Sequence, residues 1–304
     1  MRFFIKKLLK KFKIRNYSST NWRKIISENR EEFELIKKKA NGKKILIATS
    51  SGGQLFCSHF ESLLAFALTF YGARVEILLC DKVLPACMMA TSNFIDEEKF
   101  SEKGVSKICN GCLDSGEFAF DGLDLKINYY SEFVTNEEVK EINKKVNYLN
   151  YNDLASYSED GINIGEHSLA GALRYYAVGS LEDQKHKDKI LRKFVQAGLI
   201  SKKVMSQFFK ENPDFEIVIS NHAIYIPQGI IRSVSKKHGK KMFLWEGFRR
   251  EGKIEIPRDI TVFEFETMYH LPGDLIEDGF SVVNTSWTPL YLVNGGVKQP
   301  RARR

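Results

Sequence analysis

The chain has 304 residues, enough for two compact domains or for one large domain with insertions. Hydrophobic residues make up 43% and charged residues 28%, a balance typical of a globular protein and unlike that of a disordered or membrane-spanning one. Neither a run of about 18 apolar residues nor a secretory signal is visible, so we expect a cytoplasmic protein with reduced or metal-bound cysteines.

The net charge of +8 is concentrated at the N-terminus, where residues 2–15 contain seven Lys or Arg residues and no acid. The apolar residues of this stretch recur at helical spacing: Phe4, Ile5, Leu8, Leu9 and Phe12. Two interpretations stay open. Residues 1–15 bind an anionic membrane surface as an interfacial helix, peripheral on the inner face of the cytoplasmic membrane, or they fold onto their own domain. Because no motif for DNA or RNA accompanies the charge, nucleic acid is not expected as a partner.

The next elements predict a βαβ unit. A charged helix over residues 21–39 ends at Asn41 and Gly42, and an apolar strand follows over residues 44–49. A loop of small residues then leads into a helix over 55–71 and a second buried strand over 74–80.

The rest of the chain is first helical and then alternating. Helices are expected over residues 135–149, 162–178 and 181–210, the last with a break at Gly198. Strands are expected at 215–220, 241–245 and 260–265, with a helix over 227–238. The pattern predicts an α/β fold, a Rossmann-like doubly wound parallel sheet with a helical, cysteine-bearing insertion at about 81–212. The predicted domains are basic amphipathic helices over 1–42, the α/β domain over 43–290 and a basic tail over 291–304.

The loop after the first strand is a candidate binding site. Its residues are Ser50, Ser51, Gly52, Gly53 and Gln54. Backbone amides and the positive end of the following helix favour polar or anionic ligands there, and two glycines let a ligand approach the backbone. The loop matches neither the dinucleotide fingerprint nor a P-loop, and a tight strand-to-helix turn without ligand is the alternative.

Four cysteines form the second candidate site. They are Cys80, Cys87, Cys109 and Cys112, of which the last two form a C-x-x-C pair. Four thiolates in a tetrahedral arrangement suit structural zinc, and less well an iron–sulfur cluster. The alternative is a set of buried free thiols.

Histidines at strand ends and helix starts form the third candidate site. His222 follows a predicted strand at the place where open α/β sheets bind ligands, and is the best-placed general base. Glu166 and His167 begin an apolar helix and complete the predicted catalytic set. The predicted substrate-binding residues are Ser51, Gly52, Gly53, Gln54, Arg174, Asn221, Tyr225, Gln228 and His270.

Several of these segments resemble a family of bacterial capsule and surface-polysaccharide biosynthesis proteins, and the strand, Ser-Ser-Gly-Gly-Gln loop and helix resemble the N-terminal half of GT-B glycosyltransferases. The segments are Cys80-Asp81 with Leu84-Pro85-Ala86-Cys87, the Cys109–Cys112 pair, Ile164-Gly165-Glu166-His167 with Arg174, the stretch from Asn221 to Gly229, and Tyr269-His270. The resemblance covers residues 44 to 290 and implies sugar transfer from a nucleotide sugar to a lipid-linked or polysaccharide acceptor.

The chain departs from GT-B enzymes because it stops near the hinge, where the donor-binding domain would begin. We therefore expect the acceptor-binding half of a glycosyltransferase, with a partner chain that supplies the donor domain. The alternative is a non-catalytic polysaccharide-assembly protein with a structural metal site at its cysteines.

Overall fold

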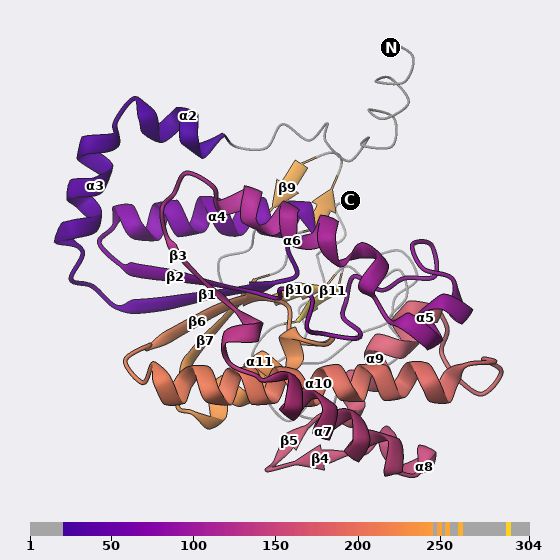
Figure 1. Cartoon of the computed structure of the whole chain (residues 1–304). Helices are drawn as coiled ribbons and strands as arrows, with labels where there is room; N and C mark the ends of the chain where they lie inside the picture. The colour runs from indigo at the N-terminus through magenta and orange to yellow at the C-terminus, as the bar shows by residue number, and fades with distance from the viewer. Residues whose placement is uncertain (1–20, 246–247, 251–252, 256–260, 264–289, 293–304) are drawn as a thin grey trace, which may run out of the picture.

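The structure, a computed structural model, describes residues 21–245 together with 248–250, 253–255, 261–263 and 290–292. At its centre is a parallel five-stranded sheet in the order β3-β2-β1-β6-β7 (Figure 1). Its strands are β1 (Lys44–Ser50), β2 (Arg74–Leu79), β3 (Lys126–Tyr129), β6 (Ile217–Asn221) and β7 (Lys241–Trp245). This confirms the predicted α/β fold with a Rossmann-like parallel sheet.

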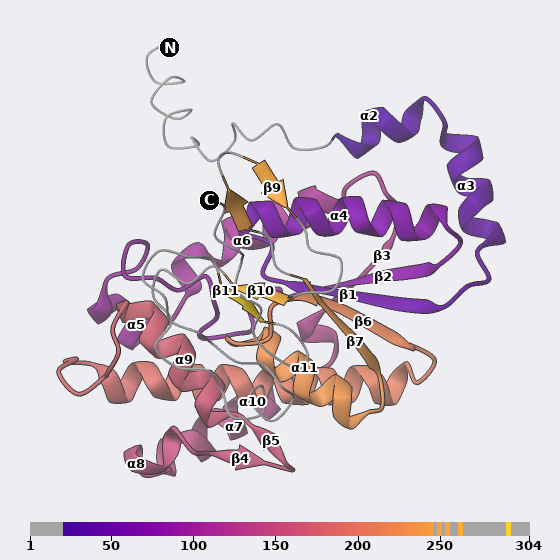
Figure 2. The same cartoon turned by 180° about the vertical axis from the view of Figure 1, so that it is seen from behind.

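Both faces of the sheet are covered by helices (Figures 1 and 2). On one face lie α2 (Trp22–Ser27), α3 (Arg30–Lys39), α4 (Leu55–Phe70) and α6 (Ser106–Phe120). On the other face lie α7 (Asn136–Tyr148), α9 (Gly165–Tyr176), α10 (Lys187–Glu211) and α11 (Gln228–Lys237). The shorter elements are α5 (Glu97–Lys103), η2 (Tyr130–Glu132), α8 (Tyr151–Leu154), and the hairpins β4 (Ser158–Glu159) with β5 (Ile162–Asn163), β8 (Phe248–Arg250) with β9 (Lys253–Glu255), and β10 (Thr261–Phe263) with β11 (Leu290–Leu292).

The central strand β1 shows why the sheet is buried on both sides. Its side chains alternate, so that Ile45 and Ile47 pack in one hydrophobic cluster with α4 while Leu46 and Ala48 pack in a second cluster with α10. The register pairs Ile45–Ile47 with Ile217–Ile219 of β6, which aligns the carboxyl ends of these two strands.

The segment between β2 and β6 is mainly helical, as predicted, but it also supplies β3, which pairs with β2 and was not predicted. Its longest helix, α10, is a single helix of 25 residues, so the predicted break at Gly198 is wrong. A Cβ at Gly198 would lie 2.7 Å from Cγ2 of Ile164, so this glycine allows close packing and does not interrupt the helix.

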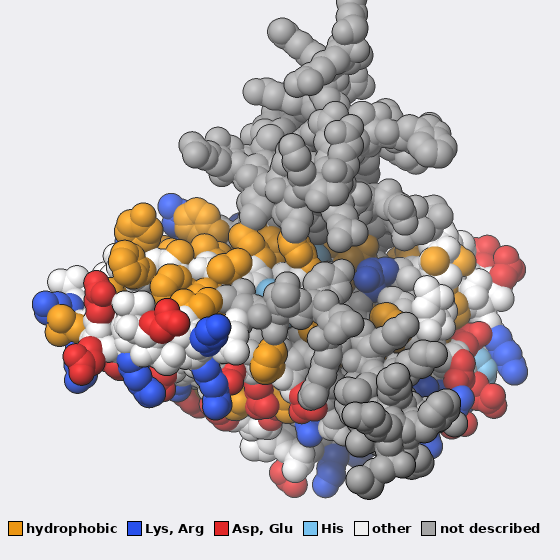
Figure 3. Space-filling view, turned by 90° about the horizontal axis from the view of Figure 1, so that it is seen from above, with side chains coloured by type: hydrophobic (Ala, Val, Ile, Leu, Met, Phe, Trp, Pro, Cys, Tyr) orange, Lys and Arg blue, Asp and Glu red, His pale blue; other side chains and the backbone are white. Residues whose placement is uncertain are grey.

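The outer face of α4 is apolar although it is exposed. Phe56, Leu63 and Phe70 recur every seven residues on this helix and are 40%, 49% and 54% exposed. Hydrophobic side chains accordingly gather on the face of the molecule that Figure 3 shows. Among the described helices, none is long and apolar enough to cross a membrane.

Candidate active site at the carboxyl edge of the sheet

The strand order reverses between β1 and β6. From β1 the chain proceeds to β2 on one side, and from β6 it proceeds to β7 on the other. The loop after β1 leads to α4 on one face of the sheet, and the segment after β6 leads to α11 on the other (Figure 1). Parallel α/β sheets bind their ligands outside the carboxyl ends of the strands at such a reversal, so the candidate site lies beyond Ser50 and Asn221.

A strained turn ends β1. Ser50 has a φ of +56°, and the amide of Ser51 donates to the carbonyl of Thr49 at 2.5 Å. A non-glycine residue in this conformation is costly and is retained where the surrounding structure enforces it. Here the buried Tyr130 hydroxyl donates to Ser50 Oγ at 3.0 Å, and the Cys80 amide donates to the Ser50 carbonyl at 2.9 Å.

A glycine is required at position 52 of this loop by a close approach of α6. A Cβ at Gly52 would lie 2.3 Å from the Cα of Gly116. The amide of Gly53 donates to Sγ of Cys112 at 3.1 Å, so a thiol of this chain occupies the place predicted for a ligand. Ser51 is buried in the same loop, and Gln54 precedes the first turn of α4 without capping it through its side chain.

His222 is a buried, neutral hydrogen-bond donor. Its Nδ1 accepts from the amide of Ile224 at 3.3 Å, which places the ring proton on Nε2. Nε2 is buried and has no hydrogen-bond partner. Burial, aided by the charge of Arg174 and that of His167, lowers the pKa of His222 to about 3. The predicted role of general base therefore fits this histidine poorly, whereas donation from Nε2 fits it well.

Arg174 lies beside His222 at the end of α9. One guanidinium nitrogen, Nη1, donates to the carbonyl of Met88 at 2.6 Å, and the guanidinium carbon lies 5.2 Å from the centre of the Tyr225 ring. The Tyr225 ring is in turn 5.2 Å from the imidazole of His222. Within the described part of the chain, no carboxylate forms an ion pair with Arg174. The arrangement therefore presents a positive charge and a neutral N–H donor together.

Gln228, the first residue of α11, faces the same group of residues. Its Nε2 donates to the sulfur of Met88 at 2.9 Å, while its buried Oε1 has no partner. Met88, which the sequence did not indicate, thus positions both Arg174 and Gln228 through different atoms.

The other two predicted catalytic residues have structural contacts. Nδ1 of the fully buried His167 lies 2.6 Å from the carbonyl of Ile224, and its ring packs so closely on Gly229 that a Cβ there would lie 2.2 Å from Nδ1. Oε2 of Glu166 accepts from the side chain of Asn163 at 2.9 Å at the start of α9. His167 thus packs against the segment after β6 and Glu166 contacts the residues before α9, and the catalytic role of both stays a prediction.

A buried acid that the sequence prediction missed lies on the α4 side of the same edge. Glu61 is 1% exposed, and its Oε1 accepts from the indole N–H of Trp245 at 3.0 Å. Burial raises the pKa of Glu61 to about 7, although Thr49, Trp245 and the Asn221 backbone amide each lower it. The sequence did contain a signal for Glu61, because it is the one residue among Asp, Glu, Lys and Arg in the 16 residues of α4.

The cysteines come close together but do not form the predicted zinc site. Each of Cys80 and Cys87 has its pKa raised by burial and, to a smaller degree, by charge on the other clustered thiols. The pKa reaches about 12 for Cys80 and about 11 for Cys109, so these groups are neutral thiols. Over the described ranges, no group of three or more His, Cys, Asp or Glu side chains could hold a metal ion.

The physical reason lies in α6. The predicted knuckle at Cys109 and Cys112 is part of a regular helix, where Cys109 donates to the carbonyl of Val105 at 3.2 Å while Cys112 accepts from Gly53. The two sulfurs are therefore engaged with different parts of the backbone. The predictions of structural zinc and of an iron–sulfur cluster are wrong, and the alternative of free thiols fits the structure.

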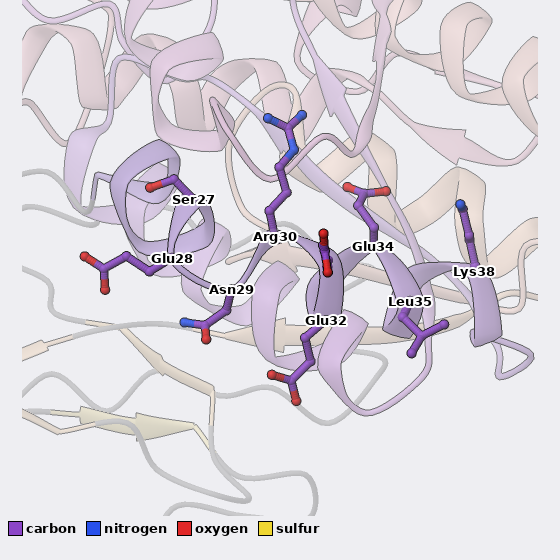
Figure 4. Close-up of a pocket in the computed structure, with 9 residues that line it drawn as sticks. Ser27, Glu28, Asn29, Arg30, Glu32, Glu34, Leu35 and Lys38 are labelled. Carbon is purple, nitrogen blue, oxygen red and sulfur yellow. The ribbon is translucent and has the colours of Figure 1, made fainter.

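A separate hollow lies on α2 and α3, near the amino end of β1 (Figure 4). It has a volume of about 940 Å³ and is lined by Ser27, Glu28, Asn29, Arg30, Glu31, Glu32, Glu34, Leu35 and Lys38. Its lining is mostly charged and exposed, and it lacks the buried unpartnered polar atoms found at the carboxyl edge. We therefore do not regard it as the functional site. The predicted membrane-binding residues 1–15 and the predicted ligand His270 lie outside the described residues.

Comparisons with known proteins give a likeness in structure only. No family model and no curated protein matches the chain. A cyclodipeptide synthase from Fluoribacter dumoffii matches 75% of this chain and 95% of its own, with 11% identity and a TM-score of 0.42. One from Bacillus thermoamylovorans matches 70% and 91%, with 14% identity and a TM-score of 0.37. A tyrosyl-tRNA synthetase from Archaeoglobus fulgidus matches 70% and 61%, with 12% identity and a TM-score of 0.30.

These findings correct the predicted family and function. The matching solved structures include cyclodipeptide synthases and a tRNA synthetase, and no family model or curated protein connects the chain to capsule biosynthesis, so the glycosyltransferase prediction and its polysaccharide-assembly alternative are wrong. The nucleotide sugar, the sugar acceptor, the membrane surface and the donor-domain partner are withdrawn with it. The predicted exclusion of nucleic acid is also withdrawn, because proteins named for tRNA are among the matches. At these identities and TM-scores the likeness assigns no activity to this chain, so its function must be argued from its own residues.

Proposed function

We propose that the protein is an enzyme whose small-molecule substrate carries an anionic or carbonyl oxygen, bound at the carboxyl edge by Arg174 and His222. The observation that carries the proposal is the buried Nε2–H of His222, which has no hydrogen-bond partner and lies beside an arginine without a described carboxylate. An unpaired buried donor costs about 1–3 kcal/mol, and such a cost is retained mainly at functional sites.

The chemistry of the two groups is complementary. Arg174 supplies a permanent charge, and its contact with the Tyr225 ring and its hydrogen bond to Met88 hold the guanidinium in place. His222 supplies a neutral donor, because its lowered pKa keeps the imidazole uncharged at physiological pH. Preorganised donors of this kind stabilise negative charge that develops on a substrate oxygen, as in acyl or phosphoryl transfer. The unpartnered Oε1 of Gln228 would accept from a substrate hydroxyl or amide.

Anion binding tests the proposal directly. Acetate, inorganic phosphate and a library of anionic metabolites are titrated while the imidazole resonances of His222 are followed by NMR. We expect binding to shift the Nε2–H resonance and to raise the pKa of His222, because a bound anion favours the imidazolium form. Loss of one charged or neutral donor costs about 1.5–3 kcal/mol, so Arg174→Lys and His222→Phe should each weaken binding roughly 10- to 100-fold.

Two controls separate binding from folding. Arg74→Lys and His238→Gln change exposed or partly exposed groups elsewhere and should leave affinity unchanged. His222→Gln retains an N–H donor and should restore part of the affinity that His222→Phe loses. If no anion perturbs His222, or if the control variants weaken binding as much as the site variants, the proposed function is wrong.

A further inference from the structure

Three oxygen atoms at the same sheet edge are buried without a hydrogen-bond partner. They are Oε2 of Glu61, Oδ1 of Asn221 and Oγ1 of Thr49. The three residues are 1%, 4% and 5% exposed. They come from three elements, α4, β6 and β1, and Thr49 and Asn221 stand at the carboxyl ends of the two strands where the strand order reverses.

The Glu61 and Asn221 side chains are fixed by their other atoms. Oε1 of Glu61 accepts from the indole of Trp245, and Nδ2 of Asn221 donates to Sγ of Cys57 at 3.3 Å. Cys57 and Glu61 lie one turn apart on α4 and so face the end of β6 together. The unpartnered oxygens therefore belong to an ordered cluster.

The cluster needs donors and a positive charge. A carboxylate is acceptor-only when ionised, and an amide oxygen is always an acceptor. Over the described residues, no lysine or arginine forms an ion pair with Glu61. A buried carboxylate without a cation is strongly disfavoured, and a ligand with several N–H groups and one positive charge would satisfy the set.

We propose that Glu61, Asn221 and Thr49 form a subsite for a protonated amine. Its N–H groups can donate to the carboxylate, amide and hydroxyl oxygens, and its positive charge complements the one carboxylate. This inference rests on the proposed function, because it assigns the amine to the substrate held by its anionic oxygen at Arg174 and His222. Asn221 and His222 are consecutive, so the two subsites meet at the end of β6.

The test uses Trp245 as the reporter, since its indole donates to Glu61. A variant with Trp22→Phe and Trp287→Phe keeps Trp245 as its one tryptophan. Methylammonium chloride is titrated at pH 8, where Glu61 is ionised, at an ionic strength held constant with choline chloride. Choline carries the same charge but no N–H donor. We expect a saturable change in Trp245 fluorescence with methylammonium and none with choline.

Variants define the outcome. Glu61→Gln should abolish the methylammonium response, Asn221→Leu and Thr49→Val should each weaken it at least 5-fold, and Glu211→Gln, an exposed control, should leave it intact. Arg174→Lys should also leave it intact, because methylammonium has no anionic group. A response that survives in Glu61→Gln, an equal response to choline, or no response to methylammonium overturns the subsite. Because the anion titration monitors His222 instead, failure of the amine subsite and failure of the proposed function can be told apart.

Discussion

Glu61 and His222 are both buried at the carboxyl edge, yet burial shifts them in opposite directions. Burial disfavours the charged form of each, so that the pKa is raised to about 7 for the acid and lowered to about 3 for the histidine. Both shifts have the same largest cause, the loss of solvation of the charged form. Strongly shifted groups in one cleft are a mark of functional sites, which agrees with placing the substrate between them.

Glu61→Gln should stabilise the protein above pH 7. The raised pKa means that wild-type Glu61 stabilises the fold fully below about pH 4.5 and loses this contribution as the pH rises through 7. Glutamine resembles the protonated acid at every pH, so the variant should gain roughly 3 kcal/mol at pH 8 and little at pH 4. Urea unfolding at both pH values measures this. An equal effect of the substitution at the two pH values would contradict it.

Two helical glycines, Gly229 and Gly111, differ in how closely other residues pack against them. A Cβ at Gly229 of α11 would lie 2.2 Å from Nδ1 of His167, whereas a Cβ at Gly111 of α6 would meet no atom within 4 Å. Both residues are helical, so they share the same intrinsic preference for alanine.

The matched substitutions should therefore have opposite signs. Gly229→Ala should destabilise the protein by about 1–3 kcal/mol because α11 must move away from His167. Gly111→Ala should stabilise it by about 0.5–1 kcal/mol through helix propensity. Thermal unfolding of both variants measures the difference. Similar melting temperatures for the two variants would show that the close contact between His167 and Gly229 does not cause the expected destabilisation.

The sequence indicated the sheet well because its strands are short apolar runs between turn residues. Residues 241–245 were predicted with the observed limits, and residues 44–49 were one residue short of β1. Prediction from the sequence failed where tertiary contacts determine the local structure. Gly198 looked like a helix break but allows Ile164 to approach, and the C-x-x-C pair looked like a metal knuckle but lies within α6.

The same limit applies to the candidate site. His222, Arg174 and Gln228 could be predicted because residues after parallel strands and at helix starts collect at one edge. Glu61 and Met88 could not be assigned in this way, because they reach the site from the middle of α4 and from an irregular segment after β2. Sequence resemblance then attached the wrong chemistry to these residues.

At the scale of the whole molecule, Glu61 and His222 should have opposite and nearly equal effects on how the stability of the protein changes with pH. Between about pH 4.5 and 6.5 the folded state holds one extra proton at Glu61 and lacks one at His222. Stability of the Glu61→Gln variant should fall as the pH drops through this range, because His222 then acts alone. His222→Gln should show the opposite slope, and the double variant should be flat.

A slope of one proton corresponds to about 1.4 kcal/mol per pH unit, which chemical unfolding resolves easily. The wild-type protein and the double variant should therefore share a shallow pH profile that neither single variant has. If the wild type and all three variants have the same slope of stability against pH, or if the double variant is as steep as a single variant, other groups dominate the pH dependence.

The burial of the helix α10 affects how the protein unfolds. Fourteen of its residues are buried, and it packs against α5, α7, α8, α9 and α11 beneath the sheet. Amide protons along its middle can exchange with deuterium only when most of these neighbours separate as well. We expect them to be among the slowest to exchange in the chain and to report global unfolding, whereas the short α8 should exchange through local opening. The segment between β2 and β6 is thus part of the cooperative folding unit, and removing it would leave the sheet without one of its two cores.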